Sequence, residues 1–231
     1  MTSRTPIDSL ADAAQGLLLE HDITDLLLRL TADAVHFAGG GSAGLLVRTD
    51  DNLELLSATS HAATELELYQ AMCSEGPCVD VLESRAQVQA TGREEILDRW
   101  PTVGRAVVDA GYLAVNSFPL VWQGGTLGGL NIFRPVPRRL DESQRRTAQA
   151  FADMLALAVV VPEHLRAEDL SRQMARALGG RVVVEQAKGA LAHQLQIDVA
   201  AAYAELVERS AREGTSLTAT AREILWRAQK G

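Results

Sequence analysis

The sequence has few of the residues and patterns that mark secreted, membrane or fibrous proteins. Only two of its 231 residues are cysteines, Cys73 and Cys78, so at most one disulfide can form and a disulfide scaffold is excluded. The longest apolar run, Met154–Pro162, is far shorter than the ~20 residues that a transmembrane helix needs. The N-terminus has no basic segment followed by an apolar one, as a secretory signal has. We therefore expect a cytoplasmic protein without a membrane segment.

Motifs for metal binding and catalysis are also scarce. Two cysteines are too few for a four-ligand zinc site without histidines, and His36, His61 and His164 have no partner at ligand spacing. We find no Ser-His-Asp arrangement, no phosphate-binding loop and no paired catalytic carboxylates. The sequence therefore predicts no metal, no cofactor and no enzymatic activity.

The residues that are present indicate two packed modules. Hydrophobic residues make up 47% of the chain and charged residues 23%, which is typical of globular domains. The net charge of −8 is uneven: residues 1–163 hold 12 basic and 22 acidic side chains, whereas residues 164–231 hold 10 and 8. The change lies near Pro162, a natural boundary. We expect domains over residues 1–161 and 162–231, with any phosphate-binding surface confined to the second.

Helical and strand patterns alternate in the first domain. The predicted helices cover two stretches within 7–37, then 62–72, a short turn at 79–82, 100–111, and a helix starting at the capping box of 141–144. The predicted strands cover 43–47, 53–58, a short stretch from 88, 113–121 and 127–133. The segment around 83–99 otherwise has the composition of loops. This order predicts an α+β domain with an antiparallel sheet and helices packed on a face.

The second domain has only helical patterns. Asp198 can cap a helix that ends at Gly214, and Thr215 or Ser216 can cap a final one. A seven-residue stripe runs along the first helical stretch through Leu170, Ala177, Val184 and Leu191. The pattern predicts an all-α three-helix unit. The stripe also fits pairing between two chains, so we expect a homodimer, although packing within one chain could use the stripe completely.

The segment of residues 181–191, RVVVEQAKGAL, followed by Ala202-Tyr203 and a capped final helix, closely resembles the ANTAR domain. ANTAR domains are three-helix RNA-binding modules of bacterial transcription antiterminators. The sequence departs from the usual pattern at Ala192, Gln194 and Gln196, where the family usually has methionine, arginine and a turn glycine. The resemblance implies that this protein binds an RNA stem-loop in nascent transcripts and prevents a terminator from forming.

Four short motifs in the first domain lie in the order shown by the GAF domains that precede ANTAR domains in actinobacterial regulators. They are Glu75-Gly76-Pro77-Cys78, Arg99-Trp100-Pro101, Ser117-Phe118-Pro119-Leu120 and Leu127-Gly128-Gly129-Leu130-Asn131. The resemblance implies an α+β GAF domain as signal input, followed by an all-α ANTAR domain as effector.

Candidate RNA-binding residues lie on one helix face. Arg181 and Lys188 are seven residues apart and can face a phosphate backbone, and Arg172 and Arg176 add two further cations. By spacing alone, the face fits a solvated surface with a Glu185–Lys188 pair better than a phosphate-binding one. The ANTAR resemblance favours the RNA-binding interpretation because the lysine lies inside its most specific motif.

Two more residues of this module have alternative interpretations. Tyr203 can belong to the core, or it can stack on an unpaired base of an RNA loop. Gly189 can be a packing position where a neighbouring helix comes close, which we favour, or it can contact the RNA directly.

The two cysteines support a rival hypothesis. Cys78 and Cys73, five residues apart, could act as nucleophile and resolving thiol of a GAF-fold enzyme similar to free methionine sulfoxide reductases. The simpler interpretation is that Cys78 is a small buried residue. If the GAF domain binds an unknown small-molecule ligand, we expect the pocket between the sheet and the segment Met72–Ala90. A role in dimerisation alone is equally open.

Overall fold

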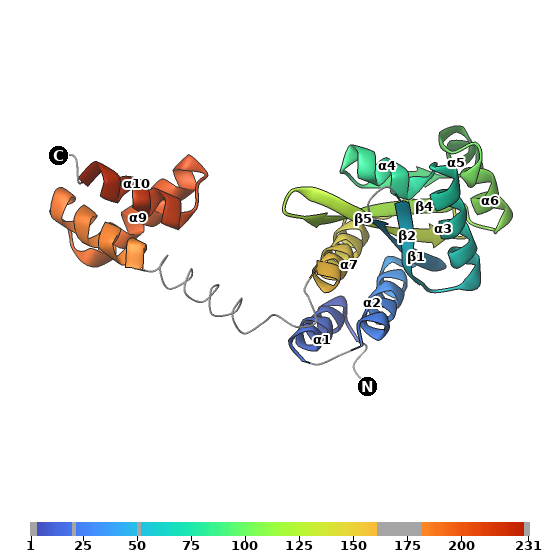
Figure 1. The fold of residues 1–231 in the computed structure, drawn as a ribbon, viewed down its shortest axis with the longest axis horizontal. Helices are drawn as coiled ribbons and strands as arrows, with labels where there is room; N and C mark the ends of the chain where they lie inside the picture. The colour runs from blue at the N-terminus through green and yellow to red at the C-terminus, as the bar shows by residue number, and fades with distance from the viewer. Residues whose placement is uncertain (1–3, 20–21, 50–51, 161–181, 229–231) are drawn as a thin grey trace. The chain divides into compact units, whose positions relative to one another are not determined.

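The chain divides by its internal contacts into two units, residues 1–163 and 164–231, called here the N-terminal and C-terminal units (Figure 1). The structure, a computed structural model, describes residues 4–19, 22–49, 52–160 and 182–228. Each unit is described by itself.

One antiparallel sheet organises the N-terminal unit. Its strands, in the order β2-β1-β5-β4-β3, are β1 (Ser42–Thr49), β2 (Asn52–Ala58), β3 (Val88–Thr91), β4 (Ala114–Trp122) and β5 (Gly125–Arg134). The β4–β5 turn is tighter than the predicted loop of residues 123–126. Gln123 and Gly124 both have positive φ, 49° and 80°, which is the requirement of a two-residue type I′ hairpin. The α+β class with an antiparallel sheet is confirmed.

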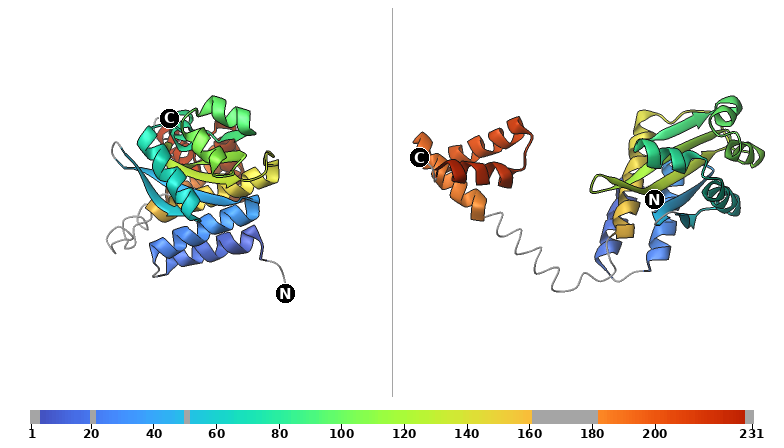
Figure 2. Two further views of the ribbon diagram at one scale, coloured as in Figure 1. Left: turned by 90° about the vertical axis from the view of Figure 1, so that its right-hand side faces the viewer. Right: turned by 45° about the horizontal axis from the view of Figure 1, so that its top comes forward.

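Helices cover both faces of this sheet, whereas the sequence predicted helices on a face (Figure 2). One face carries α1 (Pro6–Leu18), α2 (Ile23–Ala38) and α7 (Glu142–Val160). The other carries α3 (His61–Cys73), α4 (Pro77–Ser84), α5 (Arg93–Arg99) and α6 (Val103–Asp109). Helix α5 lies where a loop was predicted. It has only seven residues and one buried apolar side chain, Ile96, so the sequence carries no helical period there.

Local capping explains where the helices of the first face begin. Asp22 accepts hydrogen bonds from the backbone N–H groups of Thr24 and Asp25 and so starts α2 after the predicted break. The capping box predicted before α7 is present, because the side chains of Asp141 and Gln144 each accept from the other's backbone N–H. Phe151 and Leu155 of α7 are fully buried against the sheet.

The C-terminal unit packs a helix over residues 182–195 against α9 (Val199–Glu213) and α10 (Leu217–Ala228). Asp198 caps α9, Gly214 ends it in the left-handed conformation, and Ser216 caps α10. Its core comprises Ala187, Leu191, Ala202, Leu206, Ala221 and Ile224, so the described part of the stripe packs within the unit. Leu170 and Ala177 lie outside the described residues. None of the described helices is long and apolar enough to cross a membrane.

Candidate nucleic-acid interface and the polar interior

Lys188 and Tyr203 come together on the surface of the C-terminal unit. The Lys188 ammonium nitrogen lies 5.7 Å from the centre of the Tyr203 ring, which is cation–π distance. The same nitrogen lies 2.8 Å from a carboxylate oxygen of Glu185. The ring therefore holds the lysine over its face, and both groups are presented from two different helices at one point.

Tyr203 is not part of the core. The residue is 45% exposed and stands outside the apolar cluster of the unit, so the core interpretation is wrong. An exposed aromatic ring next to a cation has the composition of surfaces that stack and neutralise single-stranded nucleic acid. The Lys188–Tyr203 pair is therefore the candidate nucleic-acid interface.

Gly189 lies beside this pair and packs against no neighbouring element among the residues that the structure describes. No described atom would come within 4 Å of a Cβ added there, and the residue is exposed, so the predicted close approach of a neighbouring helix is wrong. A glycine inside a helix costs roughly 1 kcal/mol relative to alanine. This position thus weakens the helix without any compensation from packing inside the described unit.

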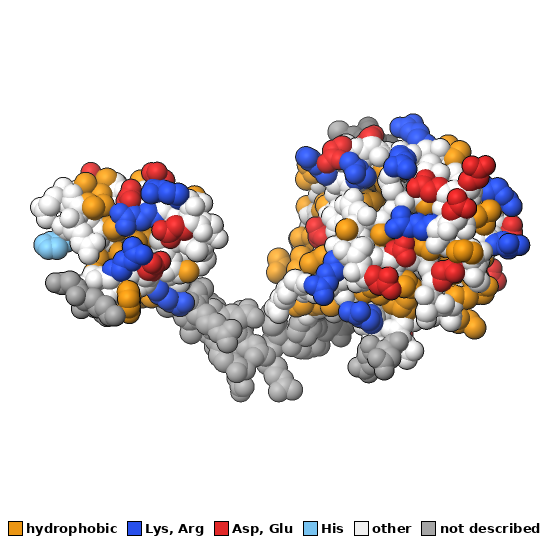
Figure 3. All heavy atoms as spheres, turned by 90° about the horizontal axis from the view of Figure 1, so that it is seen from above, with side chains coloured by type: hydrophobic (Ala, Val, Ile, Leu, Met, Phe, Trp, Pro, Cys, Tyr) orange, Lys and Arg blue, Asp and Glu red, His pale blue; other side chains and the backbone are white. Residues whose placement is uncertain are grey.

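Most other described cations of the unit are engaged by acidic side chains of their own helix. Arg209, Arg212 and Arg227 pair with the glutamates four residues before them, at 2.5, 3.2 and 2.5 Å. The space-filling view shows blue and red side chains side by side on this unit (Figure 3). Such pairs are typical of a solvated helix surface. Arg172, Arg176 and Arg181, the other predicted RNA-binding residues, lie outside the described residues.

Gln196 takes the place of the turn glycine that ANTAR domains usually have. Its φ of 54° is left-handed, as a glycine would adopt without strain. The side-chain nitrogen of Gln196 donates to the carbonyl of His193 at 2.7 Å, which ties the turn to the end of the preceding helix. The turn is therefore kept although the glycine is missing.

The second candidate region is a buried polar cluster in the N-terminal unit, between the sheet and helices α3 and α4. Asn131 of β5 donates to both carboxylate oxygens of Glu67 at 3.0 and 2.9 Å, and Gln70 donates to the same carboxylate. Ser117 donates to Asn131 at 2.5 Å, and the backbone N–H of Cys78 donates to Gln70 at 3.1 Å. These buried side chains occupy the space between the sheet and helices α3 and α4.

Glu67 has no cationic partner among the described residues that contact it. Burial of the carboxyl raises the pKa of Glu67 from 4.5 to about 8, and the hydrogen bonds from Asn131 and Gln70 offset only part of this rise. The site accepts the glutamate only because Gly44 faces it: a Cβ at Gly44 would lie 2.3 Å from the glutamate Cγ. A neutral carboxyl is thus built into the domain core.

The sequence motifs supplied only part of this cluster. Ser117, Asn131 and Cys78 belong to the recognised motifs, whereas Glu67 and Gln70 were missed because polar residues on a helix are normally assigned to solvent. The spacing of these two residues was a signal that could have identified them. Glu67 and Gln70 each stand four residues after a buried apolar residue, Ala63 and Leu66, so they share the helix face that packs on the sheet.

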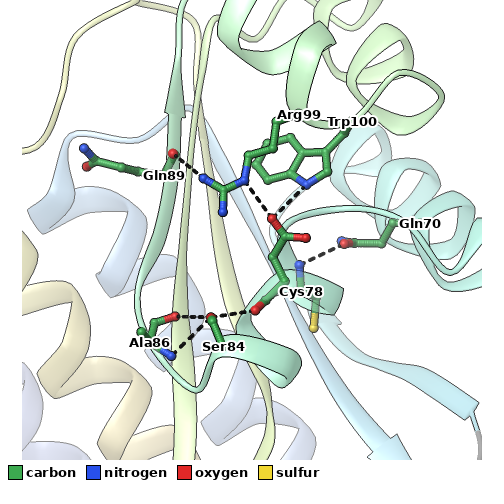
Figure 4. Close-up of polar contacts among 8 residues, drawn as sticks. Gln70, Cys78, Ser84, Ala86, Gln89, Arg99 and Trp100 are labelled. Atoms are coloured by element: carbon green, nitrogen blue, oxygen red, sulfur yellow. Dashed lines mark hydrogen bonds and ion pairs between the residues drawn. The ribbon is translucent and has the colours of Figure 1, made fainter.

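The two cysteines are free, and they differ in environment. Cys78 is fully buried, and burial, reinforced by the nearby Glu67 carboxyl, raises the pKa of its thiol far above the ordinary value. Its sulfur points away from the polar group around Arg99 and Trp100 (Figure 4). Cys73 is half-buried. A thiol that resists ionisation is a poor nucleophile.

The remaining motif residues hold helices α4 to α6 in place. Asp80 of α4 accepts from the Arg99 guanidinium at 2.7 Å and from the Trp100 indole at 3.2 Å, and the Arg99 guanidinium lies 5.5 Å from the Trp100 ring centre. Glu75 accepts from the backbone N–H groups of Thr102 and Val103 and thereby anchors the start of α6. These are structural contacts.

An open groove of about 260 Å³ lies at the predicted pocket position. It runs between β1, β2 and the segment that follows α3, and its lining residues are Arg48, Asn52, Leu53, Ala71, Ser74, Val79, Leu82 and Glu83. Neither cysteine contributes to this lining. Within the described ranges, no group of three or more His, Cys, Asp or Glu side chains could hold a metal ion.

Comparison with known families matches both units. Residues 20–160 match the GAF domain and residues 172–225 match the ANTAR domain. No match was found among curated proteins.

Solved structures share the fold of the N-terminal unit. The phycocyanobilin-bound GAF domain from a cyanobacterial phytochrome superposes with a TM-score of 0.54 at 14% identity, covering 71% of this chain and 98% of that one. The GAF domain from an Acinetobacter phosphoenolpyruvate-protein phosphotransferase superposes with a TM-score of 0.52 at 12% identity, covering 68% of this chain and 94% of that one. The GAF domain from the Coxiella burnetii phosphoenolpyruvate-protein phosphotransferase superposes with a TM-score of 0.51 at 16% identity, covering 67% of this chain and 92% of that one. At these identities the likeness concerns the fold alone.

Proposed function

Because this chain belongs to the GAF domain family and carries an ANTAR domain, an RNA-binding antitermination module, we propose that it is a cytoplasmic, non-enzymatic regulator that binds stem-loops in nascent RNA. The observation that carries the proposal is the contact between Lys188, whose side chain is 18% exposed, and the exposed ring of Tyr203. At this point an ammonium group can bind an RNA phosphate, and the neighbouring aromatic ring can stack on an unpaired loop base.

We propose that Tyr203 and Lys188 contact different parts of the RNA loop. Tyr203 stacks on an unpaired base, while Lys188, held over the ring and steered by Glu185, neutralises the adjacent phosphate. Gly189, next to the lysine and without packed neighbours in the described part of the chain, lets the RNA backbone approach the helix closely. Binding a stem-loop in this way would stabilise it against the competing terminator. Arg172, Arg176 and Arg181 are proposed as additional phosphate contacts.

The test is a titration of fluorescent tandem-hairpin RNA with the full chain and two charge-matched variants. Lys188→Met keeps an unbranched apolar stem on Tyr203 but removes the charge, and we expect at least tenfold weaker binding with a smaller salt slope. Arg212→Met removes one charge from the opposite side of α9, nine residues from Tyr203, and should change affinity less than twofold. Equal affinities for both variants would refute the assignment.

We propose that two chains act together. Several apolar side chains on the helices of one sheet face are exposed, namely Ile7, Leu18, Leu28 and Leu157. A second copy covering them would bring two ANTAR domains to two hairpins and raise avidity without new contacts. Light scattering at micromolar concentration should give twice the chain mass of 24.8 kDa. The monomer mass, with and without RNA, would argue against a dimer.

The GAF domain is proposed as the signal input. A GAF domain is a signal-sensing domain, and the groove lined by Arg48, Ser74 and Glu83 is a place for a small molecule. The alternative, a thiol reductase using Cys78 and Cys73, is disfavoured because burial keeps the Cys78 thiol protonated. Methionine sulfoxide turnover lost on Cys78→Ser would reverse this preference.

A further inference from the structure

A second cavity of about 210 Å³ lies on the opposite face of the sheet from the polar cluster. Strand β3 and the residue before it supply Gln89, Val88 and Gln87, strand β4 supplies Asn116 and Phe118, and helix α7 supplies Arg145. Gln89 and Asn116 are direct partners in the antiparallel β3–β4 register, so their side chains lie on the same face. The cavity is therefore formed where the edge of the sheet extends beyond α7.

Asn116 is buried, and its side-chain nitrogen has no hydrogen-bond partner among the described residues. Burial of an unpaired N–H is unfavourable, and buried polar groups in native proteins are nearly always satisfied. The side-chain amide of Gln89 beside it also makes no hydrogen bond within the described part of the chain, although the backbone carbonyl of Gln89 accepts one from Arg99. The side chain of Gln87, in contrast, donates to Gln149 of α7 at 3.2 Å. The cavity thus presents donors that lack an acceptor.

The charge around the cavity favours an anion. Arg145 is its only charged lining residue, and no carboxylate contributes to the lining. Arg145 pairs with Glu142, but the same carboxylate also pairs with Arg146 at 2.9 Å. These three side chains keep one net positive charge, and the five N–H donors of a guanidinium leave several free for a planar oxyanion.

We infer that the Asn116–Arg145 cavity binds a small carboxylate with an apolar body. Arg145 binds the carboxylate group, Asn116 and Gln89 donate hydrogen bonds to its oxygens, and Phe118 forms the apolar wall. This inference stands apart from the proposed RNA interface, because its residues all lie in the N-terminal unit.

The probe is benzoate, titrated into the ¹⁵N-labelled full chain and followed by two-dimensional NMR. We expect saturable shifts of the Asn116 side-chain NH₂ signals, and at least tenfold weaker binding of benzamide, which has the same shape without the charge. Arg145→Gln should weaken benzoate binding at least tenfold. Arg93→Gln, which removes an exposed cation at the start of α5 on the other face of the sheet, away from Glu142 and from the cavity lining, should leave benzoate binding within twofold.

Three outcomes overturn the inference. They are absent shifts at Asn116, equal binding of benzoate and benzamide, and equal losses in the two arginine variants. Both substitutions are at surface arginines, so the folded spectrum of each variant is the internal control. Asn116→Leu, which removes the donor and fills part of the cavity, should abolish the shifts of the Gln89 side chain.

Discussion

The buried Glu67 carboxyl should make the stability of the N-terminal unit depend on pH in an unusual direction. Burial raises its pKa in the folded state to about 8, whereas the unfolded chain releases the proton near 4.5. Between these values the folded protein holds a proton that the unfolded chain does not. The contribution of the Glu67 carboxyl to the free energy of unfolding is therefore fully present below pH 4.5 and is lost progressively as the pH rises to about 8.

The magnitude follows from the size of the shift. Each unit of pKa difference corresponds to 1.36 kcal/mol, so the whole titration of Glu67 amounts to about 5 kcal/mol. Because the carboxyl is completely buried, solvent screening does not reduce this value. From pH 5.5 to 8.5, a range above the isoelectric point, the free energy of unfolding of the wild type should fall by about 3 kcal/mol because of this one group.

The perturbation is Glu67→Gln, which keeps the size of the side chain and cannot titrate. Urea unfolding at several pH values would be followed by fluorescence in a Trp226→Phe background, where the remaining tryptophans, Trp100 and Trp122, report on the N-terminal unit. The stability of the variant relative to wild type should rise by about 3 kcal/mol between pH 5.5 and 8.5. The constant cost of exchanging an acid for an amide cancels in this difference.

The matched control is Glu65→Gln on the same helix, whose side chain is 69% exposed. That variant should follow the wild-type pH dependence within about 0.5 kcal/mol. Parallel curves for wild type and Glu67→Gln would refute the reasoning. They would mean that the carboxyl is ionised in the folded protein or reaches solvent.

Further predictions concern two glycine-to-alanine substitutions and the accessibility of the two cysteine thiols. Gly189→Ala should stabilise the C-terminal unit by about 0.5–1 kcal/mol in thermal unfolding and weaken RNA binding; unchanged RNA affinity would remove this glycine from the interface. Gly128→Ala places a Cβ 2.0 Å from the Leu46 carbonyl oxygen and should cost more than about 2 kcal/mol, read by urea unfolding; a wild-type midpoint would show that β1 and β5 can separate. A thiol reagent under native conditions should label Cys73 at least tenfold faster than Cys78, a ratio that urea abolishes; fast labelling of both would revive the enzyme hypothesis.

Local signals predicted much of the fold because they act within a few residues. The Asp141–Gln144 capping box, the Asp198 cap and the Gly214 stop all stand where the sequence placed them. The break between α1 and α2 follows from Asp22 in the same way. Helix α5 was missed because seven residues with one buried position have no detectable period.

The interior of the N-terminal unit could not be predicted from local signals. Glu67 and Asn131 are 64 residues apart, and only the β1–β5 pairing brings Gly44 and Asn131 to the same place under α3. At the proposed RNA-binding surface, the sequence indicated Lys188 and left Tyr203 undecided. Their contact depends on how two helices pack, which the spacing within one helix does not encode.

The most direct test of the central claim is single-round transcription in vitro through a terminator whose stem overlaps an upstream tandem hairpin. The wild-type chain and Arg212→Met should raise read-through in a concentration-dependent manner, whereas Lys188→Met should require at least tenfold more protein, because it lacks the charge held over Tyr203. Equal read-through with Lys188→Met and Arg212→Met, or none with the wild type on a hairpin that it binds, would contradict the account.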